Sequence, residues 1–203
     1  MKVSNRFTLA RAIFAPIFYL IYIIPVWFQS DSLSALSAYI MIPLLFIFEL
    51  TDYFDGHYAR KYNEVSDFGK IFDPFADVIL NLTVFMCAVS AGYMPAILFM
   101  LILYREFTQS FLRMAALKKG VAIAARKGGK VKTVSYIISC FFFLLIESFK
   151  RLDLGGLSAE SKSAVTTCSE HILLALFIIC VLLSWGSFID YIRSFYSIVK
   201  DND

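Results

Sequence analysis

The sequence predicts an all-α, polytopic membrane protein, and three observations lead to this fold class. Hydrophobic residues make up 59% of the 203 residues, whereas soluble domains are about 45–50% apolar. Several apolar runs reach the roughly 20 residues that a helix needs to cross a bilayer. These runs are too long and uniform for barrel strands, and in lipid each helix satisfies its own backbone hydrogen bonds. We therefore expect one transmembrane domain over residues 1-203, with six transmembrane helices.

The first predicted span covers residues 12–28, and the stretch before it has a different character. Residues 4–11 intersperse apolar side chains with Arg6 and Arg11, which predicts a short N-terminal interfacial helix. Basic residues before an apolar run also begin secretory signal peptides. This run, however, contains two prolines, and no clear small-residue cleavage site follows it. We predict that it is retained as a span.

The other five spans are bounded by polar interruptions. They are predicted at residues 34–56, 71–92, 94–117, 131–149 and 170–190. The second and third carry aspartates where they approach each other along the chain, the fourth carries arginines inside an apolar run, and the fifth follows a basic segment. The sixth follows residues 150–169, which contain Gly and Ser and which we expect to be an external, mobile connection.

Basic residues collect in alternate connections, which predicts the orientation. Lys and Arg accumulate on the cytoplasmic side of membrane proteins. Here they precede the first span and separate the second from the third and the fourth from the fifth, as Lys2, Arg6, Arg11, Arg60, Lys61, Lys70, Lys118, Lys119, Arg126, Lys127, Lys130 and Lys132. We therefore expect a multi-pass protein of the cell's inner (cytoplasmic) membrane with both termini facing the cytoplasm.

Four aspartates lie where the second and third spans meet this predicted cytoplasmic side. The i,i+3 spacing of Asp52 and Asp55 and the i,i+4 spacing of Asp73 and Asp77 put each pair on one helical face. A membrane-embedded aspartate costs about 2.5–3.5 kcal/mol, so four of them need a cation. Carboxylates favour Mg²⁺, Mn²⁺ or Ca²⁺ and can hold two ions about 3.5–4 Å apart. The alternative is that these groups are solvated, cap helices or pair with nearby basic residues.

The same segment resembles a known signature. It reads D-Y-F-D-G-H-Y-A-R from Asp52 to Arg60, followed after eight residues by Gly69 and then by Asp73 and Asp77 at intervals of four. This is similar at every fixed position to D-x2-D-G-x2-A-R-x8-G-x3-D-x3-D, the signature of the CDP-alcohol phosphotransferase family. The resemblance implies a six-span fold, a CDP-linked substrate, two bound Mg²⁺ or Mn²⁺ ions and a homodimer.

The resemblance also implies roles for individual residues. The metal ligands would be Asp52, Asp55, Asp73 and Asp77. Asp77 would in addition be the catalytic base that accepts the proton of the attacking hydroxyl. The CDP group would be bound by Asp52, Gly56, Ala59, Arg60, Gly69 and Asp73. Small residues let a nucleotide approach the backbone, and an arginine can bind a phosphate with two parallel hydrogen bonds.

A second set of residues resembles motifs of the phosphatidylglycerophosphate synthases within that family. The set consists of R-E-x3-S-x2-R from Arg105 to Arg113, G-K-x-K-T from Gly129 to Thr133, and an N-terminal N-x-x-T-x-x-R. This resemblance implies transfer of the phosphatidyl group from CDP-diacylglycerol to glycerol 3-phosphate. The acceptor's phosphate would be bound by Arg105, Arg113, Lys130 and Lys132, and the further candidates for the site are Thr8, Arg11, Ser110 and Arg126.

Other readings stay open at this point. Val78 follows Asp77 where those synthases usually have Lys, and Tyr136 stands where Gln is common. The acceptor could therefore be inositol phosphate or serine, or choline or ethanolamine carried on CDP. The chain could also be a cation carrier or a prenyltransferase. The basic segment before the fifth span could instead only set the topology and contact anionic lipid. The aromatic residues are interpreted as membrane packing, so no nucleic acid partner is expected.

Overall fold

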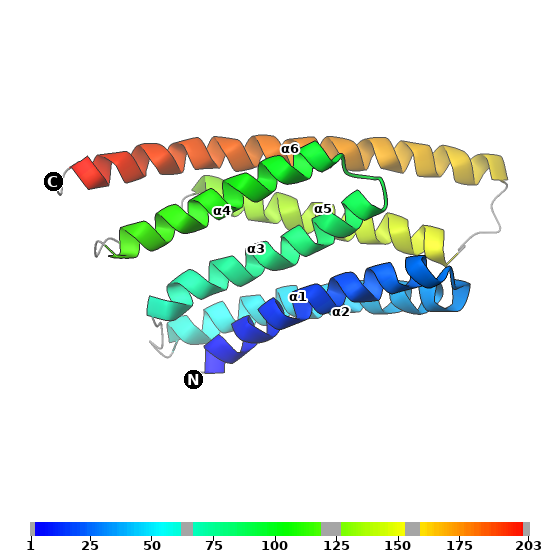
Figure 1. The fold of residues 1–203 in the computed structure, drawn as a ribbon, viewed down its shortest axis with the longest axis horizontal. Helices are drawn as coiled ribbons and strands as arrows, with labels where there is room; N and C mark the ends of the chain where they lie inside the picture. Colours follow the sequence, from blue (N-terminus) through cyan, green and yellow to red (C-terminus); the bar gives the residue numbers. More distant parts are fainter. Residues whose placement is uncertain (1–2, 62–66, 119–126, 153–158, 201–203) are drawn as a thin grey trace.

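The computed structural model describes residues 3–61, 67–118, 127–152 and 159–200, and the described residues form six α-helices (Figure 1). These are α1 (Val3–Phe28), α2 (Asp31–Lys61), α3 (Asp67–Ser90), α4 (Ala96–Lys118), α5 (Lys127–Arg151) and α6 (Ala159–Lys200). No strand occurs in these ranges. The predicted all-α fold is confirmed.

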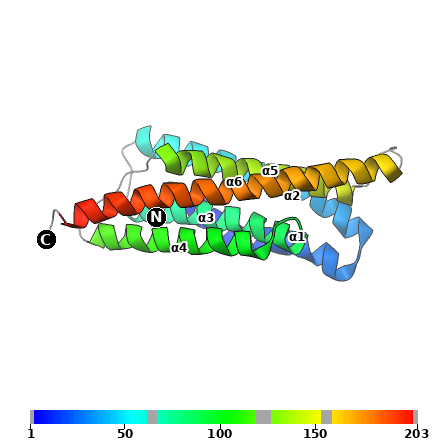
Figure 2. The same ribbon diagram turned by 90° about the horizontal axis from the view of Figure 1, so that it is seen from above.

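The six helices lie side by side as an elongated bundle, and both termini lie at the same end (Figure 1). The end of α2, the start of α3, the end of α4 and the start of α5 lie at that end too. The α1–α2 and α3–α4 connections lie at the opposite end. In the perpendicular view, α6 runs along the bundle with α4 and α5 beside it (Figure 2).

Apolar side chains hold the bundle together at its centre. Phe85 on α3 packs edge-on against Phe177 on α6, with 5.4 Å between ring centroids, and against Tyr136 on α5 at 5.2 Å. α1 packs against α2 and α3, and α5 packs against α2, α3 and α6. Many large apolar side chains, such as Trp27 and Leu182, point outward instead. Outward apolar surface is expected where lipid is the solvent.

Within the described ranges, five helices are long and apolar enough to cross a membrane by length and composition. They are the segments Thr8–Phe28, Asp31–Thr51, Phe72–Ser90, Gly128–Arg151 and Ala164–Arg193. The fourth helix, α4, is 23 residues long but carries Arg105, Glu106 and Arg113. Because Arg105 and Glu106 are buried inside the bundle, their charges need not face lipid. That α4 is a sixth span stays a prediction.

Two expected boundaries need correction. The expected short interfacial helix is not a separate element, because residues 4–11 are the first turns of α1. No Gly or Pro interrupts the chain between this stretch and the first span, so the helix continues. In the expected connection at residues 150–169, the described residues are mostly helical, since α5 continues to Arg151 and α6 begins at Ala159, and residues 153–158 lie outside the described ranges. Hydropathy marks the width of the membrane, whereas a helix continues beyond it until a breaker ends it.

Candidate active site

Two polar pairs join the start of α3 to α1. Thr8 Oγ1 donates a hydrogen bond of 2.5 Å to Asp73 Oδ1, and Arg11 Nη1 donates to Asp77 Oδ1 in an ion pair. Asp73 and Asp77 are one helical turn apart on α3, and Thr8 and Arg11 have the matching spacing on α1. The structure therefore brings two of the predicted metal ligands together with two of the further candidates.

The two sides of these pairs differ in exposure. Arg11 is 2% exposed and Thr8 is fully buried, whereas the Asp77 side chain is 31% exposed. The donors thus lie inside the bundle behind the carboxylates, and part of Asp77 remains open. A buried guanidinium is stable only with a counter-charge, and Asp77 provides one.

The donor set fits a hard divalent cation as far as it is described. Asp73 and Asp77 offer carboxylate oxygens one turn apart, which are the ligands that Mg²⁺ and Mn²⁺ prefer. Within the described ranges, no cluster of three or more His, Cys, Asp or Glu side chains could hold a metal. The other predicted ligands, Asp52 and Asp55, lie in the last turns of α2, where their side chains are outside the described residues. The four-carboxylate site stays a prediction.

The predicted CDP pocket falls largely on the same segment. On this segment it comprises Gly56, Ala59, Arg60 and Gly69, and the side chains of Ala59 and Arg60 lie outside the described residues. Arg126, a further candidate for the site, lies outside them as a whole. The backbone of α2 is helical through Lys61, and that of α3 is helical from Asp67. The signature aspartates therefore lie on helices, and the end of α2 and the start of α3 lie at the end of the bundle that holds both termini (Figure 1).

A second polar cluster, buried between α4, α5 and α6, centres on Glu106. Its Oε1 atom accepts hydrogen bonds from Arg105 Nη1 at 2.7 Å, Lys132 Nζ at 2.7 Å and Tyr136 Oη at 3.0 Å. All four residues are buried. We call Arg105, Glu106, Lys132 and Tyr136 the Glu106 cluster. It contains two cations and one anion, so it carries net positive charge inside the bundle.

Helix α6 fixes one side of this cluster. Arg105 Nε donates to the Ser184 carbonyl oxygen at 3.0 Å, and Arg105 Nη2 donates to Ser187 Oγ at 2.7 Å. Tyr136 Oη lies 2.8 Å from Ser184 Oγ. The Arg105 guanidinium also lies 5.7 Å from the centre of the Phe188 ring. Arg105 is thereby held by three hydrogen bonds and an aromatic contact.

The four predicted acceptor-phosphate residues do not occupy equivalent places. Arg105 and Lys132 are buried in the Glu106 cluster, whereas Lys130 is exposed. Arg113 is half-buried, and its Nε has no hydrogen-bond partner among the described residues. Ser110 is also half-buried. The structure thus joins two of the four, and leaves Arg113 with a donor to spare.

One face of α3 connects the aspartates to the centre of the bundle. Asn81 Nδ2 donates to the Asp77 carbonyl oxygen at 2.9 Å, and Asn81 Oδ1 accepts from Cys140 Sγ on α5 at 3.5 Å. One turn further, Phe85 packs against Tyr136 of the Glu106 cluster. The residues at positions 77, 81 and 85 share a face, so this face of α3 leads from the carboxylates toward the buried cations.

The sequence predicts no role for four residues in or beside the Glu106 cluster. Glu106 belongs to the R-E-x3-S-x2-R motif and Tyr136 lies three residues after the G-K-x-K-T motif, whereas Ser184 and Ser187 belong to neither. The available signal was weak: two serines at i,i+3 in a long apolar run, which is the spacing of one helical face. Small polar residues at such positions are typical of contacts between membrane helices.

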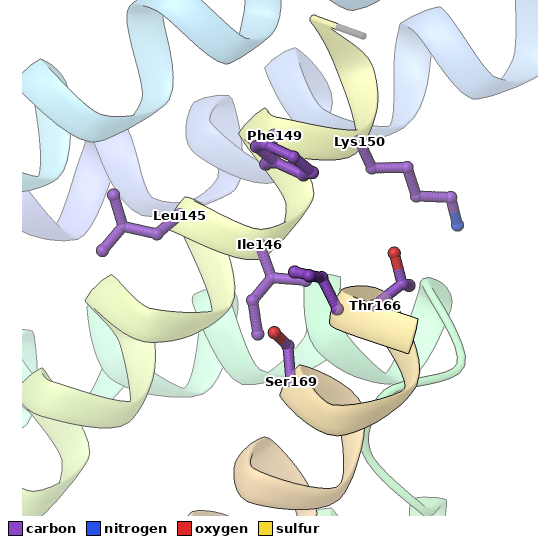
Figure 3. Close-up of a pocket in the computed structure, with 7 residues that line it drawn as sticks. Leu145, Ile146, Phe149, Lys150, Thr166 and Ser169 are labelled. Carbon is purple, nitrogen blue, oxygen red and sulfur yellow. The ribbon is translucent and has the colours of Figure 1, made fainter. Parts of the chain in front are cut away.

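A groove elsewhere in the bundle is separate from both the polar pairs of α1 and α3 and the Glu106 cluster. It has a volume of about 180 Å³ and lies between the last turns of α5 and the first described side chains of α6 (Figure 3). Its lining is mostly apolar and includes Leu145, Phe149 and Val165, with Lys150 and Thr166 at its edge. Among its described lining residues there is no carboxylate, so these offer no ligands of the kind found on α3.

Comparisons with known proteins agree on one family. The family model described as CDP-alcohol phosphatidyltransferase matches residues 1–183. A Treponema pallidum protein named CDP-diacylglycerol–glycerol-3-phosphate 3-phosphatidyltransferase is 36% identical over 204 residues, covering 98% of this chain and 92% of the relative. Proteins of the same name from Bacillus subtilis and Mycoplasma genitalium are 37% and 34% identical, over 71% and 83% of this chain and 77% and 72% of theirs.

Proposed function

This chain belongs to the CDP-alcohol phosphatidyltransferase family, and from that membership we propose that it makes phosphatidylglycerol phosphate from CDP-diacylglycerol and glycerol 3-phosphate, with release of CMP. The resemblance found in the aspartate signature is thereby confirmed. The chain is a membrane transferase of phospholipid biosynthesis. The names of its relatives support glycerol 3-phosphate as the acceptor.

The observation that carries this choice of acceptor is the buried positive charge of the Glu106 cluster. Arg105 and Lys132 share a single counter-charge, Glu106. Uncompensated charge inside a bundle is costly, so a ligand that brings negative charge is favoured there. Glycerol 3-phosphate carries a phosphate, as inositol phosphate does, whereas serine, choline and ethanolamine do not. Between the two phosphates, the names of the relatives favour glycerol 3-phosphate. Arg113 and Lys130 are the other cations that we assign to this phosphate, with Ser110 and Arg126 as further contacts.

The metal assignment follows from the family and the donor chemistry. Members of this family generally depend on a divalent metal. We assign two Mg²⁺ or Mn²⁺ ions to Asp52, Asp55, Asp73 and Asp77. When bound, such ions neutralise the charge of the diphosphate. The hydrogen bond from Thr8 orients Asp73 for this purpose.

The reaction needs one base and one leaving group. The acceptor hydroxyl oxygen attacks the phosphorus that carries the diacylglycerol, a new P–O bond forms, and the bond to CMP breaks. CMP leaves with the bonding electron pair as its phosphate oxygen. The Asp77 carboxylate takes the hydroxyl proton, and the Arg11 guanidinium beside it holds that carboxylate in position. Gly56, Ala59, Arg60 and Gly69 bind the CDP group.

The proposed location follows from charge and topology. The chain is a membrane protein. We place it in the inner membrane as a multi-pass protein, with the reacting groups and both termini on the cytoplasmic side. Two features support this: the basic residues collect in the sequence near both aspartate-bearing helix ends, and those ends lie with the termini (Figure 1). The homodimer implied by the family is proposed on that ground alone.

The test is CMP release by the purified protein in detergent, with CDP-diacylglycerol and Mg²⁺. Glycerol 3-phosphate is compared with inositol phosphate, serine and buffer alone, and CDP-choline with diacylglycerol is tested separately. We expect release with glycerol 3-phosphate only, and none from Asp77→Asn. Release with a different acceptor would refute the substrate assignment while keeping the reaction class. Ion flux into vesicles without CMP release from any mixture would favour the cation carrier.

A further inference from the structure

The Glu106 cluster ties α4 to α5 through side chains. The backbones of the described parts of α4 and α5 do not approach each other closely, while each packs on α3 and α6. Glu106 of α4 reaches across to Lys132 and Tyr136 of α5. Each of these side chains is therefore held in position by the others and by α6, rather than by close packing of the two backbones.

The number of hydroxyl protons determines which group donates in each hydrogen bond of Tyr136. A tyrosine hydroxyl has one proton, and a carboxylate only accepts. Tyr136 therefore donates its proton to Glu106 Oε1, 3.0 Å away, and the 2.8 Å contact with Ser184 is made by the serine's own proton. The result is a chain from Ser184 on α6 through Tyr136 on α5 to Glu106 on α4. It fixes the carboxylate oxygen that both cations share.

The cations have donors left over after these contacts. A lysine ammonium has three N–H groups and a guanidinium has five. One hydrogen bond from Lys132 and three from Arg105 are accounted for by Glu106, Ser184 and Ser187. Unused N–H groups on buried cations are unfavourable unless an acceptor meets them. A phosphate oxygen is such an acceptor.

We propose that Glu106 and Tyr136 are positioning residues that hold Lys132 and Arg105 where they meet the phosphate of the acceptor. This inference rests on the proposed function and deepens it. Glu106 and Tyr136 act through the two cations and do not contact the reacting atoms. Their contribution is pre-organisation: the cations are already in place when the phosphate arrives, so binding does not have to order two long side chains.

The test uses two substitutions that keep the net charge of the cluster. Tyr136→Phe removes the hydroxyl that joins Glu106 to Ser184, and Glu106→Asp withdraws the carboxylate by one methylene. We expect KM for glycerol 3-phosphate to rise roughly fivefold or more, as for loss of about one hydrogen bond's free energy. KM for CDP-diacylglycerol should stay unchanged. A matched control is Ser139→Ala, because Ser139 Oγ lies in the same α5–α6 interface and contacts Cys180 Sγ rather than the cluster.

A merely structural role would give a different pattern. It predicts a lower Tm with no change in KM for glycerol 3-phosphate, and that result would overturn the inference.

A binding measurement separates this inference from the proposed function. Inorganic phosphate is titrated against each protein in detergent, and Tm is followed. We expect phosphate to raise the Tm of the wild type and of Ser139→Ala, and to raise that of Tyr136→Phe less. If the wild type uses another acceptor yet shows this difference, the proposed function fails while the positioning role stands. If phosphate shifts wild type and Tyr136→Phe equally, or shifts neither, the positioning role is refuted.

Discussion

Arg11 and Asp77 form an ion pair across 66 positions of sequence, and this pair joins the first helix to the third. The guanidinium is buried while the carboxylate is partly open. Such a pair fixes one carboxylate oxygen, while 31% of the Asp77 side chain stays exposed. The N-terminal helix is therefore part of the candidate site as well as of the bundle.

Replacement of Arg11 tests this relationship. Arg11→Ala leaves Asp77 without its guanidinium and opens a buried gap, so we expect kcat for CMP release to fall by at least about tenfold. Arg11→Lys keeps the charge but loses the planar donor group, so its kcat for CMP release should fall less. Arg193→Ala is the control, because Arg193 is an exposed arginine on α6. Equal activity of Arg11→Ala and the wild type would contradict the role of the pair.

The hydrogen bond from Thr8 gives a second prediction. Thr8→Val keeps the shape of the side chain but removes the donor to Asp73. If Asp73 is a metal ligand, its looser orientation should raise the Mg²⁺ concentration needed for half-maximal CMP release by roughly three- to tenfold. Thr83→Val serves as a comparison, since Thr83 Oγ1 donates only to the Ile79 carbonyl of its own helix. An identical Mg²⁺ dependence in both variants would rule out this role for Thr8.

Metal removal tests the carboxylate site as a whole. Chelation with EDTA should abolish CMP release, and added Mg²⁺ or Mn²⁺ should restore it, because hard oxygen ligands bind these ions reversibly. Asp73→Asn should stay inactive at any Mg²⁺ concentration. Asp31→Asn should behave as the wild type, since Asp31 is an exposed residue in the first turn of α2 at the other end of the bundle. Full activity in EDTA would exclude a metal-dependent reaction.

The sequence predicts the helices and the aspartate signature because both are local features. The hydropathy of an apolar run is enough to predict that it enters lipid, and the spacing of Asp73 and Asp77 is enough to predict that they share one helical face. The contacts that join the Glu106 cluster across helices are not local: Lys132 is 26 positions from Glu106, and Ser184 is 79 positions from Arg105. Helices that are apolar on all sides carry little periodic signal, so the sequence does not reveal which faces meet. For the same reason Arg105 could be predicted as a phosphate ligand but not as a member of a buried ion-pair network.

The opposite end of the bundle gives a prediction about stability alone. Arg151 donates to Glu147 on α5 at 2.8 Å, to Ser37 on α2 at 2.7 Å and to the Tyr22 carbonyl on α1 at 3.2 Å. Arg151→Ala removes these bonds and leaves Glu147 buried without its partner, which typically costs about 3–5 kcal/mol. We expect a clearly lower Tm in detergent with unchanged KM values. Lys150→Ala is the neighbouring control, because Lys150 is exposed, and an equal Tm for the two variants would contradict the prediction.

Charge balance in the Glu106 cluster gives the last prediction. Glu106→Gln leaves Arg105 and Lys132 buried without their shared carboxylate, and breaking a buried pair in this way typically costs about 3–5 kcal/mol. Adding Lys132→Met removes one of the two uncompensated cations, so the double variant should have a higher Tm than Glu106→Gln alone. Its activity with glycerol 3-phosphate should nevertheless stay low, because one of the cations that we propose to bind the phosphate is gone. A double variant that regains both stability and activity would show that Lys132 serves only to neutralise Glu106; one that regains neither would show that the two residues are not coupled.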